Sequence, residues 1–107
     1  MMKLGIVIYS NEPETVWNAF RLGTFSCKQG DIVSVFLLGM GVEAESLSCE
    51  KFDVIGQMRS FTEAGGSILA CGTCLKIRQS EGSDICPLST MHDLHVMIRD
   101  SDKLLSF

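Results

Sequence analysis

The sequence contains no long apolar run and no cluster of basic residues. Apolar stretches such as Val35–Leu38 are far shorter than the roughly 18 residues that mark a membrane-spanning helix. The chain carries 9 Lys and Arg against 13 Asp and Glu, which gives a net charge of −4. It therefore lacks the concentration of positive charge with which proteins bind nucleic acid. We expect neither a membrane protein nor a protein that binds nucleic acid.

The sequence also shows no secretory signal, internal repeat or low-complexity segment. Its first residues, Met1–Ile6, have the pattern of a strand and lack the longer apolar region and small-residue cleavage site of a signal peptide. The five cysteines are an odd number, which does not suit a framework of paired disulfides. We therefore expect a reducing, cytoplasmic location, where a CxxC motif is more often catalytic or metal-binding than structural.

The apolar fraction is large for a short chain. The 107 residues fit one domain, covering residues 1–107, with a single hydrophobic core. Hydrophobic residues make up 46% of the chain, and the mean hydropathy is +0.24. A small domain has a high ratio of surface to volume and cannot bury all of these residues. We therefore expect some of the apolar side chains to lie on the surface and to face another subunit.

Continuous apolar segments alternate with amphipathic ones along the chain. Strands are predicted at residues 4–9, 32–38, 66–70, 85–86 and 103–107. Helices are predicted to begin near Asn11, Asp53, Leu75 and Ser89 or Thr90. The acidic residues 43–50 are predicted to form an exposed loop or a frayed helix. This order predicts an α/β fold with a doubly wound, mainly parallel sheet between two layers of helices, in three layers.

Three polar or glycine-containing segments follow predicted strands. In a parallel sheet, ligands and catalytic groups gather beyond the carboxyl ends of the strands, so we expect these segments to converge on one rim. The segment 39–41 has neither the full dinucleotide fingerprint nor a phosphate-loop lysine. The candidate ligand-binding residues on this rim are Ser10, Asn11, Gly39, Met40, Gly41, Gly72 and Thr73.

The motif Cys71-Gly72-Thr73-Cys74 lies between the predicted strand 66–70 and the helical stretch 75–79. The first N–H groups of a helix stabilise an anion, and a thiolate there can have its pKa lowered from about 8.5 to roughly 3.5–7.5. We therefore predict that Cys71 is an exposed nucleophile of low pKa and the more reactive thiol. Cys74, one turn into the helix, is predicted to be partly covered and to act as a resolving or assisting thiol.

Other interpretations of the motif remain open at this point. The two thiols can be buried packing residues, because free cysteine is often buried and inert. A structural zinc site needs four ligands, and Cys86, His92 and His95 do not form a standard spacing with the motif, so we predict no metal. The aromatic and proline context of a thioredoxin-type oxidoreductase is missing, although reversible disulfide formation stays open as a side reaction or a switch.

The remaining cysteines have simpler interpretations. Cys27 lies on the apolar stripe of the first predicted helix and is expected in the core. Cys49 lies in a polar segment and is interpreted as a surface residue, with an exposed reactive thiol as the alternative. Cys86 precedes Pro87 and is either a packing residue at a strand end or a thiol near the rim.

Two histidines and two basic residues lie near the same segments. His95 shares the apolar face of the last predicted helix with Leu94 and is expected in the core, whereas His92 is expected in solvent or at a subunit contact. Lys76 and Arg78 are interpreted as surface charges, with a positive potential near the thiolate as the alternative.

The segment Ala70–Lys76 resembles the central motif of the DsrE-like family, which includes the DsrE, DsrF, DsrH and Tus sulfur-relay subunits. The segments Gly39–Glu43, Glu63–Gly66 and Ser89–Asp93 match in the same order, so the likeness covers nearly the whole chain. The resemblance implies a flavodoxin-like fold and a homo-oligomer, a trimer or a hexamer. In sulfur-relay members, a cysteine at the end of the third strand accepts sulfane sulfur as a persulfide, and Cys71 is the matching position.

The resemblance predicts a sulfur carrier or sulfurtransferase-like protein that acts through Cys71 and Cys74. Sulfur donor and acceptor proteins are the implied partners, and the thiol chemistry requires no bound cofactor. The alternative is a module that binds a small ligand or regulates through redox chemistry, without catalytic turnover. A persulfide trapped on Cys71 would distinguish the two.

Overall fold

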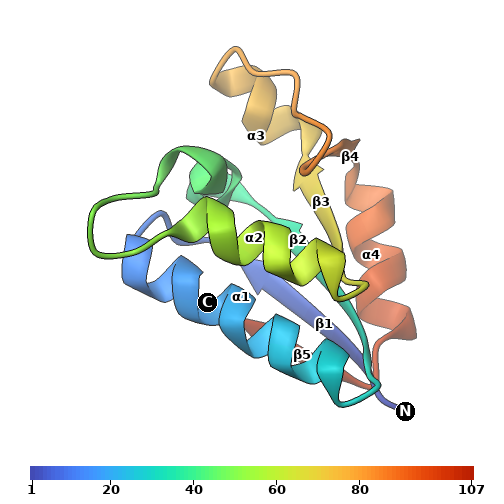
Figure 1. Cartoon of the computed structure of the whole chain (residues 1–107). Helices are drawn as coiled ribbons and strands as arrows, with labels where there is room; N and C mark the ends of the chain where they lie inside the picture. The colour runs from blue at the N-terminus through green and yellow to red at the C-terminus, as the bar shows by residue number, and fades with distance from the viewer.

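The computed structural model describes residues 1–107 and shows strands alternating with helices (Figure 1). The elements in chain order are β1 (Lys3–Ile8), α1 (Pro13–Lys28), β2 (Ile32–Leu37), the 3-10 helix η1 (Gly39–Ser46), α2 (Val54–Glu63), β3 (Ser67–Cys71), α3 (Gly72–Ile77), β4 (Leu88–Ser89), α4 (Met91–Asp100) and β5 (Lys103–Ser106). No helix combines the length and apolar character that crossing a membrane requires.

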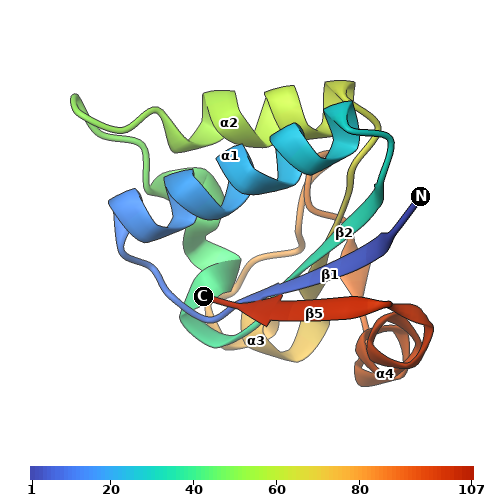
Figure 2. The same cartoon turned by 90° about the horizontal axis from the view of Figure 1, so that it is seen from below.

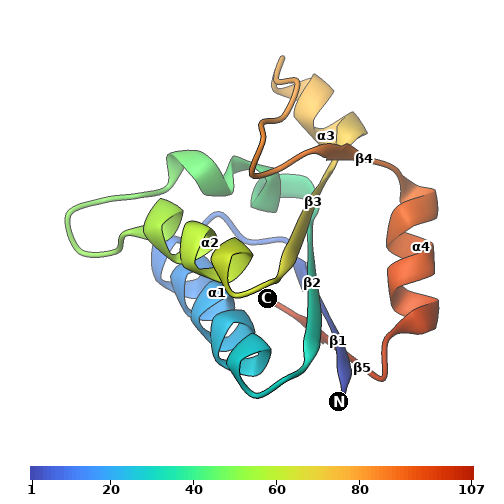
Figure 3. The same ribbon diagram turned by 45° about the vertical axis from the view of Figure 1, so that its right-hand side comes forward.

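The five strands form one parallel sheet in the order β4-β3-β2-β1-β5. Helices α1 and α2 lie side by side on one face of this sheet, and α4 lies on the other (Figure 3). Viewed from below, β5 runs along the outer edge beside β1, with α4 on the side away from α1 and α2 (Figure 2). The predicted three-layer α/β fold with a parallel sheet is confirmed, and every crossover is long enough for a parallel connection.

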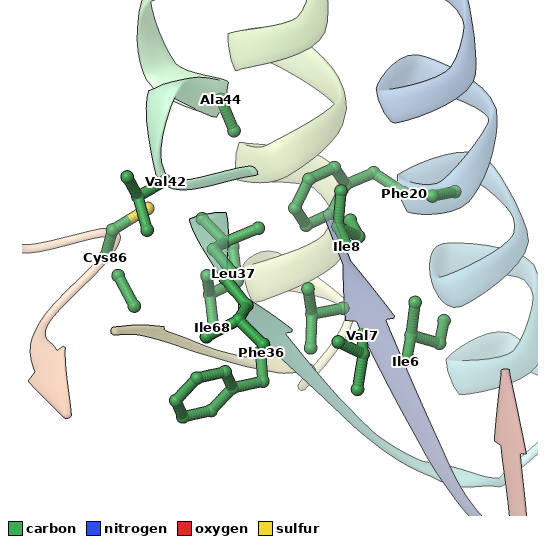
Figure 4. Close-up of a cluster of buried hydrophobic side chains, with 14 of the residues drawn as sticks. Ile6, Val7, Ile8, Phe20, Phe36, Leu37, Val42, Ala44, Ile68 and Cys86 are labelled. Atoms are coloured by element: carbon green, nitrogen blue, oxygen red, sulfur yellow. The ribbon is translucent and has the colours of Figure 1, made fainter. Parts of the chain in front are cut away.

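The core is built from the uninterrupted apolar segments of the central strands. Ile6 and Ile8 of β1 are fully buried, and the intervening Val7 lies level with Phe36 of β2 in the register. Because successive strand residues face opposite sides of the sheet, such segments suit strands with helices on both faces. Figure 4 shows Phe20 of α1 reaching toward Ile8, so helix and sheet share one cluster.

Helix α1 begins one residue later than the sequence suggested. Glu12, not Asn11, is the N-cap: its carboxylate oxygens accept the backbone N–H groups of Glu14 at 3.2 Å and Thr15 at 2.7 Å. Pro13 occupies the first turn, where its missing N–H costs no hydrogen bond. The prediction of Asn11 as the N-cap was wrong because its side chain instead donates a hydrogen bond to Glu43, 32 positions away.

The caps predicted for the other two long helices are confirmed. Asp53 accepts the N–H of Gly56 at 3.0 Å at the start of α2, and Thr90 accepts the N–H of Asp93 at 3.3 Å at the start of α4. Short polar side chains are favoured at this position because they satisfy N–H groups that have no partner inside the helix.

Two segments differ from the expected secondary structure. Residues Gly39–Ser46 form an eight-residue 3-10 helix, where residues 43–50 were expected to be a loop or a frayed helix. The short strand expected at 85–86 is found instead at Leu88–Ser89. Pro87 explains the shift: its carbonyl accepts the N–H of Ala70 at 3.1 Å, but proline has no N–H to donate, so paired strand residues begin only after it.

Helix α4 buries a narrower face than its sequence suggested. Leu94 and Met97 are the buried residues, while Ile98 is 44% exposed. His95 is exposed, so its expected place in the core was wrong. Because α4 covers its face of the sheet without a neighbouring helix, only a strip of residues three apart reaches the strands.

Candidate functional site

The structure brings the ends of β1 and β2 and the start of α3 together at the carboxyl rim of the sheet. The N–H of Leu38 donates to the carbonyl of Ile8 at 3.0 Å, which joins the first two strand ends. The next N–H, of Gly39, donates to the Sγ of Cys74 in α3 at 3.3 Å. The ends of β1 and β2 and the helix that follows β3 therefore meet at one rim, as the parallel topology implied. Of the predicted site residues, Gly39 and Cys74 are in direct contact there.

The two rim glycines hold this arrangement through their backbones. Gly39 has φ +57°, a left-handed conformation that glycine adopts without the penalty of a side chain. A Cβ on Gly41 would overlap the carbonyl oxygen of Ile8. Glycine therefore allows η1 to pass directly over the end of β1, and this close approach fixes the direction of the Gly39 N–H.

Cys71 is the last residue of β3 and is only 3% exposed. Burial raises the pKa of the Cys71 thiol, and the neighbouring Cys74 thiol raises it further; the backbone N–H groups of Cys74 and Thr73 oppose the shift without cancelling it. The expectation of an exposed Cys71 with a lowered pKa was therefore wrong. Cys71 still belongs to the sheet, beside Ser89 of β4, so the sheet and its neighbours enclose its side chain.

Cys74 lies in the first turn of α3 and is partly exposed, so the more open thiol of the pair is Cys74 and not Cys71. Its sulfur accepts a hydrogen bond from the backbone N–H of Gly39 in η1. Cys74 was expected to be the more covered thiol because it lies inside the helix. It remains accessible at the rim because α3 extends beyond the end of the sheet, as Figure 1 shows.

A line of polar contacts runs across the rim toward the same helix. The Nδ2 of Asn11 donates to Glu43 at 3.3 Å, and the Nε of Arg78 donates to the other carboxylate oxygen of Glu43 at 2.8 Å. The Nη1 of Arg78 also donates to the carbonyl of Cys74 at 3.1 Å. The hydrogen bond from Arg78, followed by that from Asn11, lowers the pKa of Glu43.

Sequence reasoning missed Glu43 and treated Arg78 as a surface charge. The four-residue spacing of Cys74 and Arg78 was a local signal that their groups share one side of α3. The partner carboxylate lies 35 positions away from Arg78 in the chain. A single sequence carries no local sign of such a pair.

The other predicted rim residues have more modest roles. The Oγ of Ser10 accepts the N–H of Glu12 at 2.9 Å and so supports the start of α1. Met40 and Thr73 are exposed, and Gly72 is partly exposed beside the carbonyl of Ser89.

The remaining cysteines lie outside this arrangement. Cys49 is exposed, and Cys27 is partly buried, with a pKa raised by burial and by the charge of Asp31. Cys86 is buried, and burial followed by the charge of Glu45 strongly raises its pKa. It borders a cavity of about 220 Å³ next to α3. No group of three or more His, Cys, Asp or Glu side chains is placed to hold a metal ion.

Two archaeal proteins are similar to this chain over most of their length. It is 29% identical over 100 residues to the uncharacterized protein MJ0989 of Methanocaldococcus jannaschii, and the matched region covers 88% of each of the two chains. It is 28% identical over 110 residues to the uncharacterized protein MK0008 of Methanopyrus kandleri, which covers 94% of this chain and 91% of the relative.

Solved structures share the fold over nearly the entire chain. The crystal structure of the ychN protein from E. coli matches with a TM-score of 0.87 and 23% identity, covering 100% of both chains. The protein BT1422 from Bacteroides thetaiotaomicron matches with a TM-score of 0.77 and 21% identity, covering 98% of this chain and 94% of that one. The sequence profile of the DsrE/DsrF-like family matches residues 2–107. The chain therefore belongs to the DsrE/DsrF-like family.

Proposed function

We propose that this protein carries sulfane sulfur as a cysteine persulfide on the pair Cys71 and Cys74, taking it from a donor and passing it to an acceptor protein. Family membership supports this, because the sulfur-relay members that the motif resembles use a cysteine at the end of the third strand. The observation that carries the proposal is a pair of free thiols at the carboxyl rim, one of which accepts a fixed backbone N–H at 3.3 Å.

The chemistry is an exchange between thiols and needs no cofactor. A cysteine thiolate attacks the outer sulfur of a donor persulfide, and the donor leaves as a thiol. An N–H that points at the sulfur stabilises the negative charge that the sulfur carries during the exchange, because hydrogen bonds to charged acceptors are stronger than those to neutral ones. The Gly39 N–H at Cys74 is such a donor.

Mass spectrometry tests the proposal directly. Protein purified without reductant, then incubated with a limiting amount of inorganic polysulfide, should gain the mass of one sulfur atom and lose it with dithiothreitol. The double variant Cys71→Ser/Cys74→Ser should gain none, whereas Cys49→Ser, which removes an exposed thiol outside the pair, should load like the wild type. Equal loading of the double variant, or no loading of the wild type, would contradict the proposal.

The alternative is a module that binds a small ligand or responds to redox conditions. The cavity of about 220 Å³ beside α3, bordered by Glu43, Arg78 and Cys86, favours it. In that case the thiols would take up no sulfur under the conditions above. Instead, a small molecule would co-purify with the wild type and be lost on Arg78→Ala substitution.

We also propose that the chain forms a homo-oligomer, a trimer or a hexamer. Large apolar side chains remain exposed on several elements, among them Phe25 at 62%, Met91 at 61% and Leu104 at 44%. Patches of this kind commonly mark contacts between subunits. Light scattering at micromolar concentration should give a mass above that of one chain.

A further inference from the structure

The two thiols of the motif differ in access from solvent, and the difference assigns them different steps. We propose that Cys74 is the thiol that receives sulfur from outside, and that Cys71 takes it from Cys74 and stores it away from solvent. This division rests on the sulfur-carrier function proposed above. It reverses the order that the sequence suggested, in which Cys71 reacted first.

Access favours Cys74 as the receiving thiol. An incoming persulfide must bring its outer sulfur into line with the attacking sulfur, which requires an open side on the attacking thiol. Cys74 is partly exposed at the start of α3, whereas Cys71 is 3% exposed within the sheet. A donor as large as a peptide or a protein can therefore meet Cys74 without unfolding the end of β3.

The backbone around Cys74 is already arranged to hold a sulfur anion. The Gly39 N–H that donates to its Sγ is held in position by its neighbours on both sides. The N–H of Leu38 donates a hydrogen bond to the carbonyl of Ile8, and Gly41 packs against that same carbonyl. The Nη1 of Arg78 donates to the carbonyl of Cys74, which holds the backbone of this turn in place. A donor fixed in this way, the Gly39 N–H, stabilises negative charge on the sulfur without having to reorganise when the charge forms.

The environment of Cys71 suits a residue that holds sulfur as a persulfide away from solvent. Cys71 is the N-cap of α3, three residues before Cys74, and the Cys74 thiol contributes to raising the pKa of Cys71. Burial keeps water and external thiols away from a persulfide at this position. The same burial makes Cys71 slow to react with an outside donor, because the thiolate is the nucleophile and burial disfavours it.

The transfer proceeds in two steps that each break one S–S bond and form another. In the first, the Cys74 thiolate attacks the outer sulfur of the donor persulfide; the donor sulfur leaves with the electron pair and takes a proton from solvent. In the second, the Cys71 sulfur attacks the outer sulfur now on Cys74. Cys74 leaves as a thiolate and accepts the proton that Cys71 gives up. Neither step needs an oxidant or a reductant, and the reverse order delivers sulfur to an acceptor thiol.

Loading single variants with glutathione persulfide tests the assignment. In the peptide that contains the motif, Cys74→Ser should load at least about 10-fold more slowly than the wild type, because only the buried thiol of the pair remains there. Cys71→Ser should still take up sulfur but lose it faster to added glutathione, because the store is absent. Cys49→Ser is the matched control and should behave as the wild type in both measurements.

The wild type gives a second measurement that depends on no variant. Brief treatment with iodoacetamide near neutral pH, followed by fragmentation of the peptide that contains both thiols, should find Cys74 alkylated before Cys71. The assignment is overturned if Cys71 is alkylated first, or if folded Cys74→Ser loads as fast as the wild type. Failure of the wild type to load at all would instead overturn the sulfur-carrier function itself.

Discussion

The part of the chain that precedes the CxxC turn is packed far more completely than the part that follows it. Of the 24 residues in the hydrophobic core, 20 lie between Leu4 and Cys71 and four lie after Cys71. Strand β1 is buried at every position after Lys3, whereas all four residues of β5 are exposed. The first region has α1 and α2 side by side over the central strands. The second has the short helix α3 beyond the end of the sheet, α4 alone on the opposite face, and two edge strands.

This difference explains why the two thiols of one short motif behave differently. Cys71 is the last residue of the packed region, and Cys74 belongs to the first helix of the open region. Local stability commonly follows the density of buried contacts, and binding segments tend to come from the less stable end. The motif therefore joins a rigid, enclosed thiol to an accessible one.

The largest effect is expected from Phe61→Ala in the packed region. The Phe61 ring is fully buried and meets the ring of Phe20 edge-on, with centroids 5.7 Å apart. Its loss should lower the free energy of unfolding by about 4 kcal/mol, measured by urea denaturation. Lys28→Ala, at an exposed position in the last turn of α1, is the control and should cost about 1 kcal/mol or less; similar losses for both would mean that the region is not tightly packed.

The corresponding change in the open region, Met97→Ala, is expected to cost about 2 kcal/mol. Met97 is 8% exposed and borders an open hollow of about 280 Å³ between α4 and the sheet, so less packing is lost. Urea denaturation compares it with Ile98→Ala, 44% exposed on the same helix, which should change stability by about 0.5 kcal/mol or less. A loss as large as that of Phe61→Ala would remove the contrast between the two regions.

Gln79→Gly should stabilise the protein by about 0.5–1 kcal/mol, a smaller effect of the opposite sign. Gln79 has φ +55° just after α3, where the N–H of Ser80 donates to the carbonyl of Leu75 at 2.9 Å and closes the helix end. Glycine adopts this conformation without strain. The control is Gln29→Gly, at a φ of −83° in the C-cap of α1, which should not stabilise the protein. Urea denaturation measures both variants. An unchanged unfolding midpoint in Gln79→Gly would show that Gln79 is not strained in the wild type.

The smallest effect is expected from Glu43→Gln, which removes the ion pair with Arg78 across the rim. Arg78 lowers the pKa of Glu43 below its ordinary value of 4.5, so the pair adds stability above that pH and loses it as the pH falls through the depressed value. The thermal midpoint of the wild type should therefore exceed that of the variant near neutral pH, and the gap should close in acid. Glu63→Gln, which removes an exposed carboxylate with no bonding partner, should show no such pH-dependent gap; a constant gap for Glu43→Gln would argue against the ion pair.

The order of strands and helices was predictable because its causes are local. Continuous apolar segments mark strands covered on both faces, and the caps at Asp53 and Thr90 use side chains next to the N–H groups that they satisfy. The errors occurred where a local signal competed with a distant partner. Asn11 has the side chain of a good cap but bonds to Glu43, 32 positions away. His95 lay on a plausible apolar face until the single-helix covering of the sheet set which strip of α4 is buried.

The sequence by itself determined the fold class, the family motif and the place of the two thiols at the end of the third strand, because hydrophobic periodicity and residue spacing express those properties directly. Only the tertiary structure decided which thiol is open and which is enclosed. That outcome depends on β4 lying beside Cys71 and on η1 placing the Gly39 N–H at Cys74. Both contacts join segments that are distant in the chain, and the parallel strand order, not any local pattern, brings them together.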